Sequence, residues 1–216
     1  MKMKNKVTLV NMISSLALQI CTIISGFIIP KIILSYFGSD VNGLISSLNQ
    51  FLSYISLLEG GVTGVVAANL YKPLVMGDNQ KLSAVVVTSK KFLNKVGTIF
   101  IAYSVCVAVA YPFVFKLNFL YVFSLTLILS MNLLVQYMFS ITLRTLLNAD
   151  KKVYVVSLTQ IVITVLNTLM AYISVKVYPS IHFLKLISGL LFFIQPIVYG
   201  SFVKKHYSID WSADVD

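Results

Sequence analysis

Apolar residues dominate the chain in six long runs, which short polar connections separate. The runs cover residues 7–35, 44–68, 92–113, 119–143, 153–175 and 186–203. A helix of roughly 20 apolar residues crosses a hydrocarbon core of about 30 Å, whereas a barrel strand needs only about 9 to 11 residues. The first run also exceeds the roughly 7 to 15 apolar residues of a signal peptide, so we expect it to remain as a helix. The pattern predicts an all-α membrane protein with six transmembrane helices.

The composition favours the same class. Of the 216 residues, 58% are hydrophobic and 11% are charged. Soluble domains carry about 25% charged residues, and a water-soluble fold of this size could not hide so much apolar surface.

Basic residues are distributed unequally between alternate connections. If the N-terminus is cytoplasmic, thirteen Lys and Arg residues lie on the inner side and four on the outer side. The inner set is Lys2, Lys4, Lys6, Lys72, Lys81, Lys90, Lys91, Lys95, Arg144, Lys151, Lys152, Lys204 and Lys205; the outer set is Lys31, Lys116, Lys176 and Lys185. Because Lys and Arg accumulate on the cytoplasmic side, we predict that both termini are cytoplasmic. The net charge of +10 gathers at membrane boundaries, so we expect membrane lipids with anionic headgroups, and not nucleic acid, as its counterpart.

The connections give the chain its organisation. Residues 36–43 contain two glycines with Ser, Asp and Asn, which is typical of a tight turn. Residues 69–91 form the longest inner connection, and we interpret its amphipathic part as a helix lying in the membrane interface. The predicted domains are a transmembrane lobe at residues 1–207 and a polar cytoplasmic tail at residues 208–216. Cys21 and Cys106 lie within apolar runs without metal or disulfide spacing, so we expect buried packing residues and no cofactor.

Polar and small residues recur every three or four positions in the first, second, fourth and fifth runs, as one face of a helix would place them. The stripes are Asn11, Ser15, Gln19, Thr22 and Gly26; Ser46, Asn49, Ser53, Ser56, Gly60, Thr63 and Ala67; Asn132, Gln136, Ser140 and Arg144; and Ser157, Gln160, Thr164, Asn167, Ala171 and Ser174. Such residues also hold packed helices together. An unpaired amide at membrane depth, however, costs several kcal/mol. We therefore predict that the stripes converge on one polar cavity containing Gln19, Asn49, Asn132, Gln136 and Asn167.

Two charged residues complete the candidate site. Glu59 is the one acidic residue inside any predicted span, which makes it a candidate for ion coupling or ligand binding. The alternative is that it reaches the inner interface and pairs with a lysine such as Lys72. Arg144 lies at the inner end of the fourth run, where it could contribute to the cavity or extend into the headgroup region.

Several segments resemble one family of transporters. They are YFGSDVNGL at residues 36–44, QFLSYISLLEGG at residues 50–61 and LYKPL at residues 70–74, followed by QY at residues 136–137 and LLNAD at residues 146–150. With the fifth run, they resemble the O-antigen and capsule repeat-unit branch of the polysaccharide-biosynthesis flippases, in the multidrug/oligosaccharidyl-lipid/polysaccharide exporter superfamily. The resemblance covers nearly the whole chain, and the first hundred residues carry most of it.

The resemblance implies a function without covalent chemistry. Members form two helical lobes around a cavity that opens alternately to each side, and they turn over an undecaprenyl-diphosphate-linked oligosaccharide in the bacterial cytoplasmic membrane. They commonly have twice as many helices, so we expect this chain to act as the N-terminal lobe, completed by a second six-helix lobe or by a second copy. The chain also lacks a basic residue near residues 66–69, where relatives are expected to carry one.

Two other classes of protein are alternatives to a transporter. A membrane enzyme of lipid or sugar transfer would need clustered acids or histidines, but the seven acidic residues are scattered along the chain, so we predict no enzyme. The second alternative is a truncated, non-transporting remnant or a membrane interaction module.

Overall fold

The computed structural model describes the chain at residues 2–59 and 61–212, including the side chains of this part except those of residues 2–5, 58 and 59. The described part is helical and contains no strand. Its elements are α1 (Lys2–Ser53), α2 (Ser56–Glu59), α3 (Val62–Met76), α4 (Asn79–Val114), α5 (Phe119–Val135), the π-helical turn η1 (Gln136–Ser140), α6 (Ile141–Ala149), α7 (Val153–Val177), α8 (Ile181–Leu191) and α9 (Ile194–His206). The predicted all-α class is confirmed.

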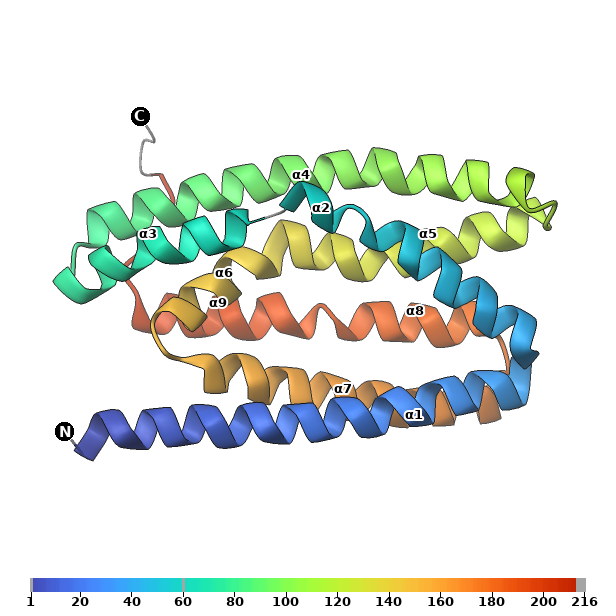
Figure 1. Ribbon diagram of the computed structural model, residues 1–216, viewed down its shortest axis with the longest axis horizontal. Coiled ribbons are helices and arrows are strands. Elements are labelled where there is room, and N and C mark those ends of the chain that lie inside the picture. Colours follow the sequence, from blue (N-terminus) through green and yellow to red (C-terminus); the bar gives the residue numbers. More distant parts are fainter. Residues whose placement is uncertain (1, 60, 213–216) are drawn as a thin grey trace.

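The helices run back and forth along one long axis (Figure 1). Gly38, with φ 84°, reverses the chain within α1, so the tight turn predicted at residues 36–43 is confirmed. The six predicted runs lie, in chain order, in residues 2–37; residues 39–53 with α2 and α3; α4; α5 with η1 and α6; α7; and α8 with α9, and we call these the six spans. The start of α1 and the end of α9 lie at the same end of the bundle, which we call the terminal end (Figure 1).

The outside of the bundle is apolar, as lipid requires. Phe27, Leu57 and Val177 are each exposed over about three quarters of their surface, whereas small hydroxyl residues such as Ser104 and Thr126 are buried between helices. Within the described residues, five helical segments are long and apolar enough to span a membrane, and α3 is a shorter apolar helix. The protein is a multi-pass membrane protein of about six helices.

Three of the six spans are interrupted in their interior. The second breaks at residues 54–55, before α2, and again at Gly61, which adopts φ 67°. The fourth widens into the π-helical turn η1, and the sixth is interrupted at residues 192–193, just before Pro196, which has no N–H to continue the helical bonding. A glycine in the second run and a proline in the sixth mark two of these breaks in the sequence.

The predicted interfacial helix is also corrected. Residues 79–91 are the first turns of α4 and continue directly into the third span. The connection shrinks to Gly77 and Asp78, because each residue ends or begins a helix. Gly77, at φ 68°, caps α3 with its N–H on the Pro73 carbonyl, and the Asp78 side chain accepts a hydrogen bond from the Lys81 N–H.

The expectation for the two cysteines also needs correction. Cys106 is exposed and Cys21 is half-buried, so neither is a fully buried packing residue, although both are free thiols. The described part of the tail predicted at residues 208–216 contacts the bundle. The Asp210 N–H donates to the Ser83 hydroxyl on α4 at 2.9 Å, and residues 213–216 lie outside the described residues.

Candidate polar cavity

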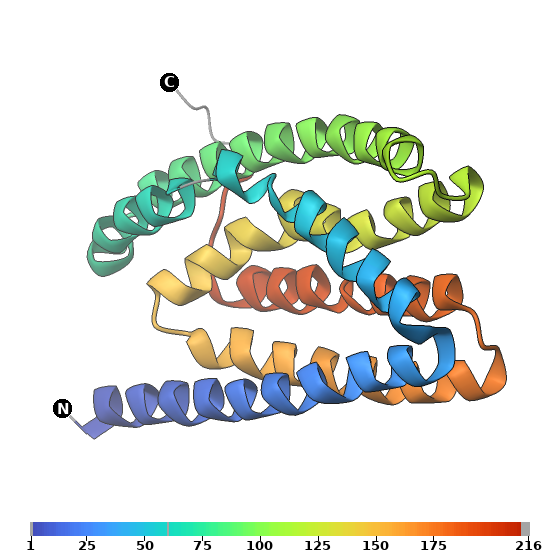
Figure 2. The same cartoon turned by 45° about the vertical axis from the view of Figure 1, so that its right-hand side comes forward.

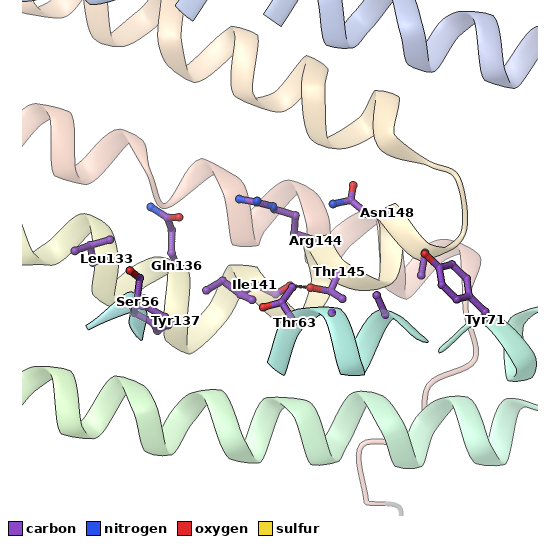
Figure 3. Close-up of a pocket in the computed structure, with 13 residues that line it drawn as sticks. Ser56, Thr63, Tyr71, Leu133, Gln136, Tyr137, Ile141, Arg144, Thr145 and Asn148 are labelled. Carbon is purple, nitrogen blue, oxygen red and sulfur yellow. Dashed lines mark hydrogen bonds between the residues drawn. The ribbon is translucent and has the colours of Figure 1, made fainter. Parts of the chain in front are cut away.

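A cavity of about 460 Å³ lies between the broken second and fourth spans (Figure 3). We call it the polar hollow. Its lining is Ser56 of α2; Thr63, Gly64, Ala67 and Tyr71 of α3; Leu133 of α5; Gln136 and Tyr137 of η1; and Ile141, Arg144, Thr145, Asn148 and Ala149 of α6. Ser56, Gly64, Arg144 and Asn148 are exposed, so the hollow is open and not sealed. It runs from the interior of the bundle toward the terminal end.

Breaks in the helices create the hollow. The left-handed backbone at Gly61 separates α2 from α3, so that α3 starts on a new line and leaves space beside η1. Opposite, the π-helical turn adds a residue to one turn, which shifts the side chains that follow. Irregular backbone at membrane depth is tolerated where it lines a cavity, and both breaks do so.

The lining offers hydrogen-bonding groups and one positive charge. Gln136, Arg144 and Asn148 project along one side of the η1–α6 segment, as Figure 3 shows. The hydroxyls of Ser56, Thr63 and other residues face the same space. None of the described carboxylates forms an ion pair with Arg144. The hollow can therefore bind a neutral polar group and an anionic group, but its described lining holds no acid, histidine or cysteine for proton transfer or nucleophilic attack.

Three of the predicted site residues line the polar hollow or contact a residue that does. Gln136 and Arg144 line the hollow. Asn132 lies one turn before Gln136, and its carbonyl oxygen accepts a hydrogen bond from the Gln136 amide at 3.0 Å. Asn132 thus orients Gln136, and the two amides satisfy part of each other's hydrogen bonding.

Of the remaining candidates, Gln19, Asn49 and Asn167 do not line the hollow. Gln19 and Asn49 are exposed elsewhere on the first and second spans. The carbonyl oxygen of Asn167 is buried in α7 and accepts no hydrogen bond from the described residues. Glu59 ends α2 between two lining residues, but its side chain lies outside the described residues. The described side chains therefore do not form the single cavity that the stripes of four helices predict.

Hydrogen bonds between the first and fifth spans explain this difference. α1 lies along α7 (Figures 1 and 2). The Asn11 amide donates to the Lys151 carbonyl at 2.7 Å, and its oxygen accepts from the Tyr154 N–H at 2.9 Å. Further along, the hydroxyls of Ser15 and Ser157, one from each stripe, are 3.4 Å apart. These two stripes hold a helix pair together, which is the alternative that the sequence left open.

Sequence reasoning missed several lining residues. Tyr71 and Asn148 were not candidates, although Asn148 lies one turn beyond Arg144 and therefore on the same helical face. Thr63 belonged to the predicted stripe of the second run but was not singled out. Spacing from Arg144 was thus the signal that could have found Asn148.

Comparisons with protein-family models, with curated proteins and with solved structures found no match to this chain.

Proposed function

We propose that the protein moves an undecaprenyl-diphosphate-linked oligosaccharide across the membrane, as one lobe of a flippase. The observation that carries the proposal is the polar hollow, which lies inside a membrane bundle between two interrupted spans. Interrupted helices that expose polar groups to a cavity are typical of transporter binding sites. The segments that resemble the flippase family include residues of this hollow, among them Ser56, Gln136 and Asn148.

The chemistry of the hollow fits that substrate class. Amides and hydroxyls can exchange hydrogen bonds with sugar hydroxyls, and Arg144 can bind a phosphate oxygen. A single arginine provides little charge for a diphosphate. We therefore propose that a second lobe, or a second copy of this chain, contributes the facing wall and further positive charge.

The second candidate is a non-transporting membrane module, and a specific observation favours it as well. Asn11, Ser15 and Ser157 are engaged in contacts between α1 and α7, so these parts of the two stripes contribute to packing and not to a path for substrate. Transport then depends on the polar hollow alone, which makes Arg144 and Gln136 the residues that separate the two candidates.

Export of polysaccharide tests the proposal in a strain that lacks its repeat-unit flippase. We expect no export with this chain alone and restored export when it is produced together with a cognate second lobe. Arg144→Gln in the pair should lower export about tenfold, because a hydrogen bond to a charged group contributes roughly 1.5–3 kcal/mol. Lys95→Gln removes an exposed charge outside the hollow and is the matched control.

The possible outcomes separate the candidates. No export from a pair that is present in the membrane and assembled would favour the non-transporting module. Full export with Arg144→Gln would indicate that the substrate does not pass through the hollow. Full export by this chain alone would indicate that a homodimer, and not a separate second lobe, completes the transporter.

A further inference from the structure

The C-terminal segment at residues 207–212 crosses the terminal end of the bundle and is held at three points. The Tyr207 hydroxyl donates to the Asp150 carboxylate at 2.6 Å. Asp210 is fixed to Ser83, as described above. The Lys90 ammonium lies 4.6 Å from the centre of the Trp211 ring, within the range of a cation–π interaction. These contacts place Trp211 against α4.

Two cavities meet at Trp211, and together we call them the tail groove. The larger, of about 640 Å³, lies between the segment and α9, with Lys204 and Ser208 in its wall. The smaller, of about 240 Å³, has Lys90 at one side and the apolar side chains of Phe139 and Pro196 in its wall. Both cavities share Gly200 and Trp211, so they adjoin.

The tail groove lies at the boundary between hydrocarbon and headgroups. Lys90 comes just before the apolar run that begins at residue 92, and Leu143, which also lines the smaller cavity, ends the run at residues 119–143. Tryptophan prefers this depth in membranes, because its ring is apolar and its N–H is polar. The groove thus has a basic, hydroxyl-bearing part and an apolar part that leads toward the membrane interior.

We propose that the tail groove binds one anionic phospholipid from the leaflet on the side of the two termini. Lys90 and Lys204 pair with the phosphate, and an acyl chain lies against Phe139 and Pro196. Charge complementarity identifies the occupant, because no acidic residue lines the described walls of either cavity. Basic pockets between membrane helices bind anionic headgroups by the same physics. This site is separate from the polar hollow and does not depend on transport.

Trp211 makes the proposal directly measurable, because it is the sole tryptophan of the sequence. Purified protein in zwitterionic detergent is titrated with phosphatidylglycerol brominated in its acyl chains, and quenching of tryptophan fluorescence is recorded. Brominated phosphatidylcholine is the neutral comparison. We expect saturable quenching by phosphatidylglycerol at concentrations at least tenfold lower than for phosphatidylcholine. Glycerol phosphate, the headgroup without acyl chains, should not displace the bound lipid at matched concentration.

Variants separate this site from general attraction to a basic protein. Lys90→Gln and Lys204→Gln should each weaken binding of phosphatidylglycerol about fivefold, as expected for one basic residue near a phosphate. Lys72→Gln with Lys95→Gln removes two exposed charges outside the groove and should leave binding unchanged. A Cβ at Gly200 meets only Leu143, at 3.9 Å, so the fold should tolerate a side chain there. Gly200→Leu should then fill the space of the acyl chain while every charge stays.

Each result supports or contradicts the lipid site. Equal quenching by the two lipids would mean ordinary contact with surrounding lipid and would overturn the proposal. So would a preference that survives Lys90→Gln and Lys204→Gln, or one that Lys72→Gln with Lys95→Gln abolishes. Displacement by glycerol phosphate would indicate a phosphate site without a lipid. The emission maximum without lipid shows whether the segment keeps its place in Lys90→Gln; if it shifts, Lys204→Gln and Gly200→Leu decide the outcome.

Discussion

Asn11 provides a sharp test of the fold, because it caps a helix from another part of the chain. The residue at the start of α7, Lys152, makes no side-chain cap bond. Asn11 supplies that cap instead by accepting from the Tyr154 N–H at 2.9 Å, and it also donates to the Lys151 carbonyl at 2.7 Å. A helix leaves its first N–H groups without partners, so this contact satisfies a group that the membrane interface would otherwise leave weakly solvated.

Asn11→Ala should lower the free energy of unfolding by about 2 kcal/mol. A helix cap contributes about 1 kcal/mol, and the second hydrogen bond contributes a similar amount. In a chain of this size, such a loss lowers the melting temperature by about 4–8 °C. Asn11→Asp keeps the acceptor for Tyr154 and loses the donor, so we expect about half of the effect.

Heating followed by size-exclusion chromatography in a mild detergent measures the loss. Thr22→Ala is the matched control on α1, since the Thr22 hydroxyl bonds only to the Leu18 carbonyl of its own helix. If Asn11→Ala destabilises the protein no more than Thr22→Ala, the capping argument is refuted.

Three further changes have defined outcomes in stability or titration. Gly97→Leu should destabilise the protein by about 1–3 kcal/mol, because even a Cβ at Gly97 would lie 2.8 Å from the Met138 Cγ; Gly26→Leu, where nothing lies within 4 Å, is the control in the same thermal assay. Lys151→Gly should stabilise by about 0.5–1 kcal/mol in that assay, since φ of 58° strains a residue with a side chain, and an unchanged or lower melting temperature would contradict this. Burial and a hydrogen bond to a neighbouring carboxylate raise the pKa of Tyr207, so its stabilising effect is present below about pH 10 and is lost only as the pH rises through the raised pKa. The tyrosinate absorbance of the parent chain minus that of Tyr207→Phe should accordingly show no ionisation near pH 10, and a step at that pH would contradict the bond.

The apolar pattern predicts the class and the spans, because lipid selects long apolar helices whatever their packing. The breaks were harder to foresee. The apolar run of the fourth span continues through η1 without a glycine or proline, so nothing in its composition marks a π-helical turn. The second span did carry a signal in Gly61, whose left-handed backbone accompanies the break.

The polar stripes predicted the site only in part, for a physical reason. A row of Ser, Thr and Asn on a membrane helix satisfies its hydrogen bonds equally well by facing another helix or by facing a cavity. Asn11 and Gln136 follow the same spacing rule, yet the first joins two helices and the second lines the polar hollow. The partner helix decides between them, and a single stripe contains no information about its partner. Residues 208–216 were predicted to form a polar cytoplasmic tail from their overall composition. Ile209 and Trp211 are the apolar exceptions in this tail.

If the polar hollow receives a substrate, it should be a water-filled space at membrane depth. Thiol labelling tests it most directly, in intact membranes and in a chain carrying Cys21→Ala and Cys106→Ala. Single replacements Thr63→Cys and Gln136→Cys are treated with a water-soluble maleimide, beside Val162→Cys, which is exposed on the lipid-facing side of α7. We predict rapid labelling at Thr63→Cys and Gln136→Cys and almost none at Val162→Cys. Labelling at Gln136→Cys as slow as that at Val162→Cys would contradict a hydrated hollow, and with it the proposed substrate path.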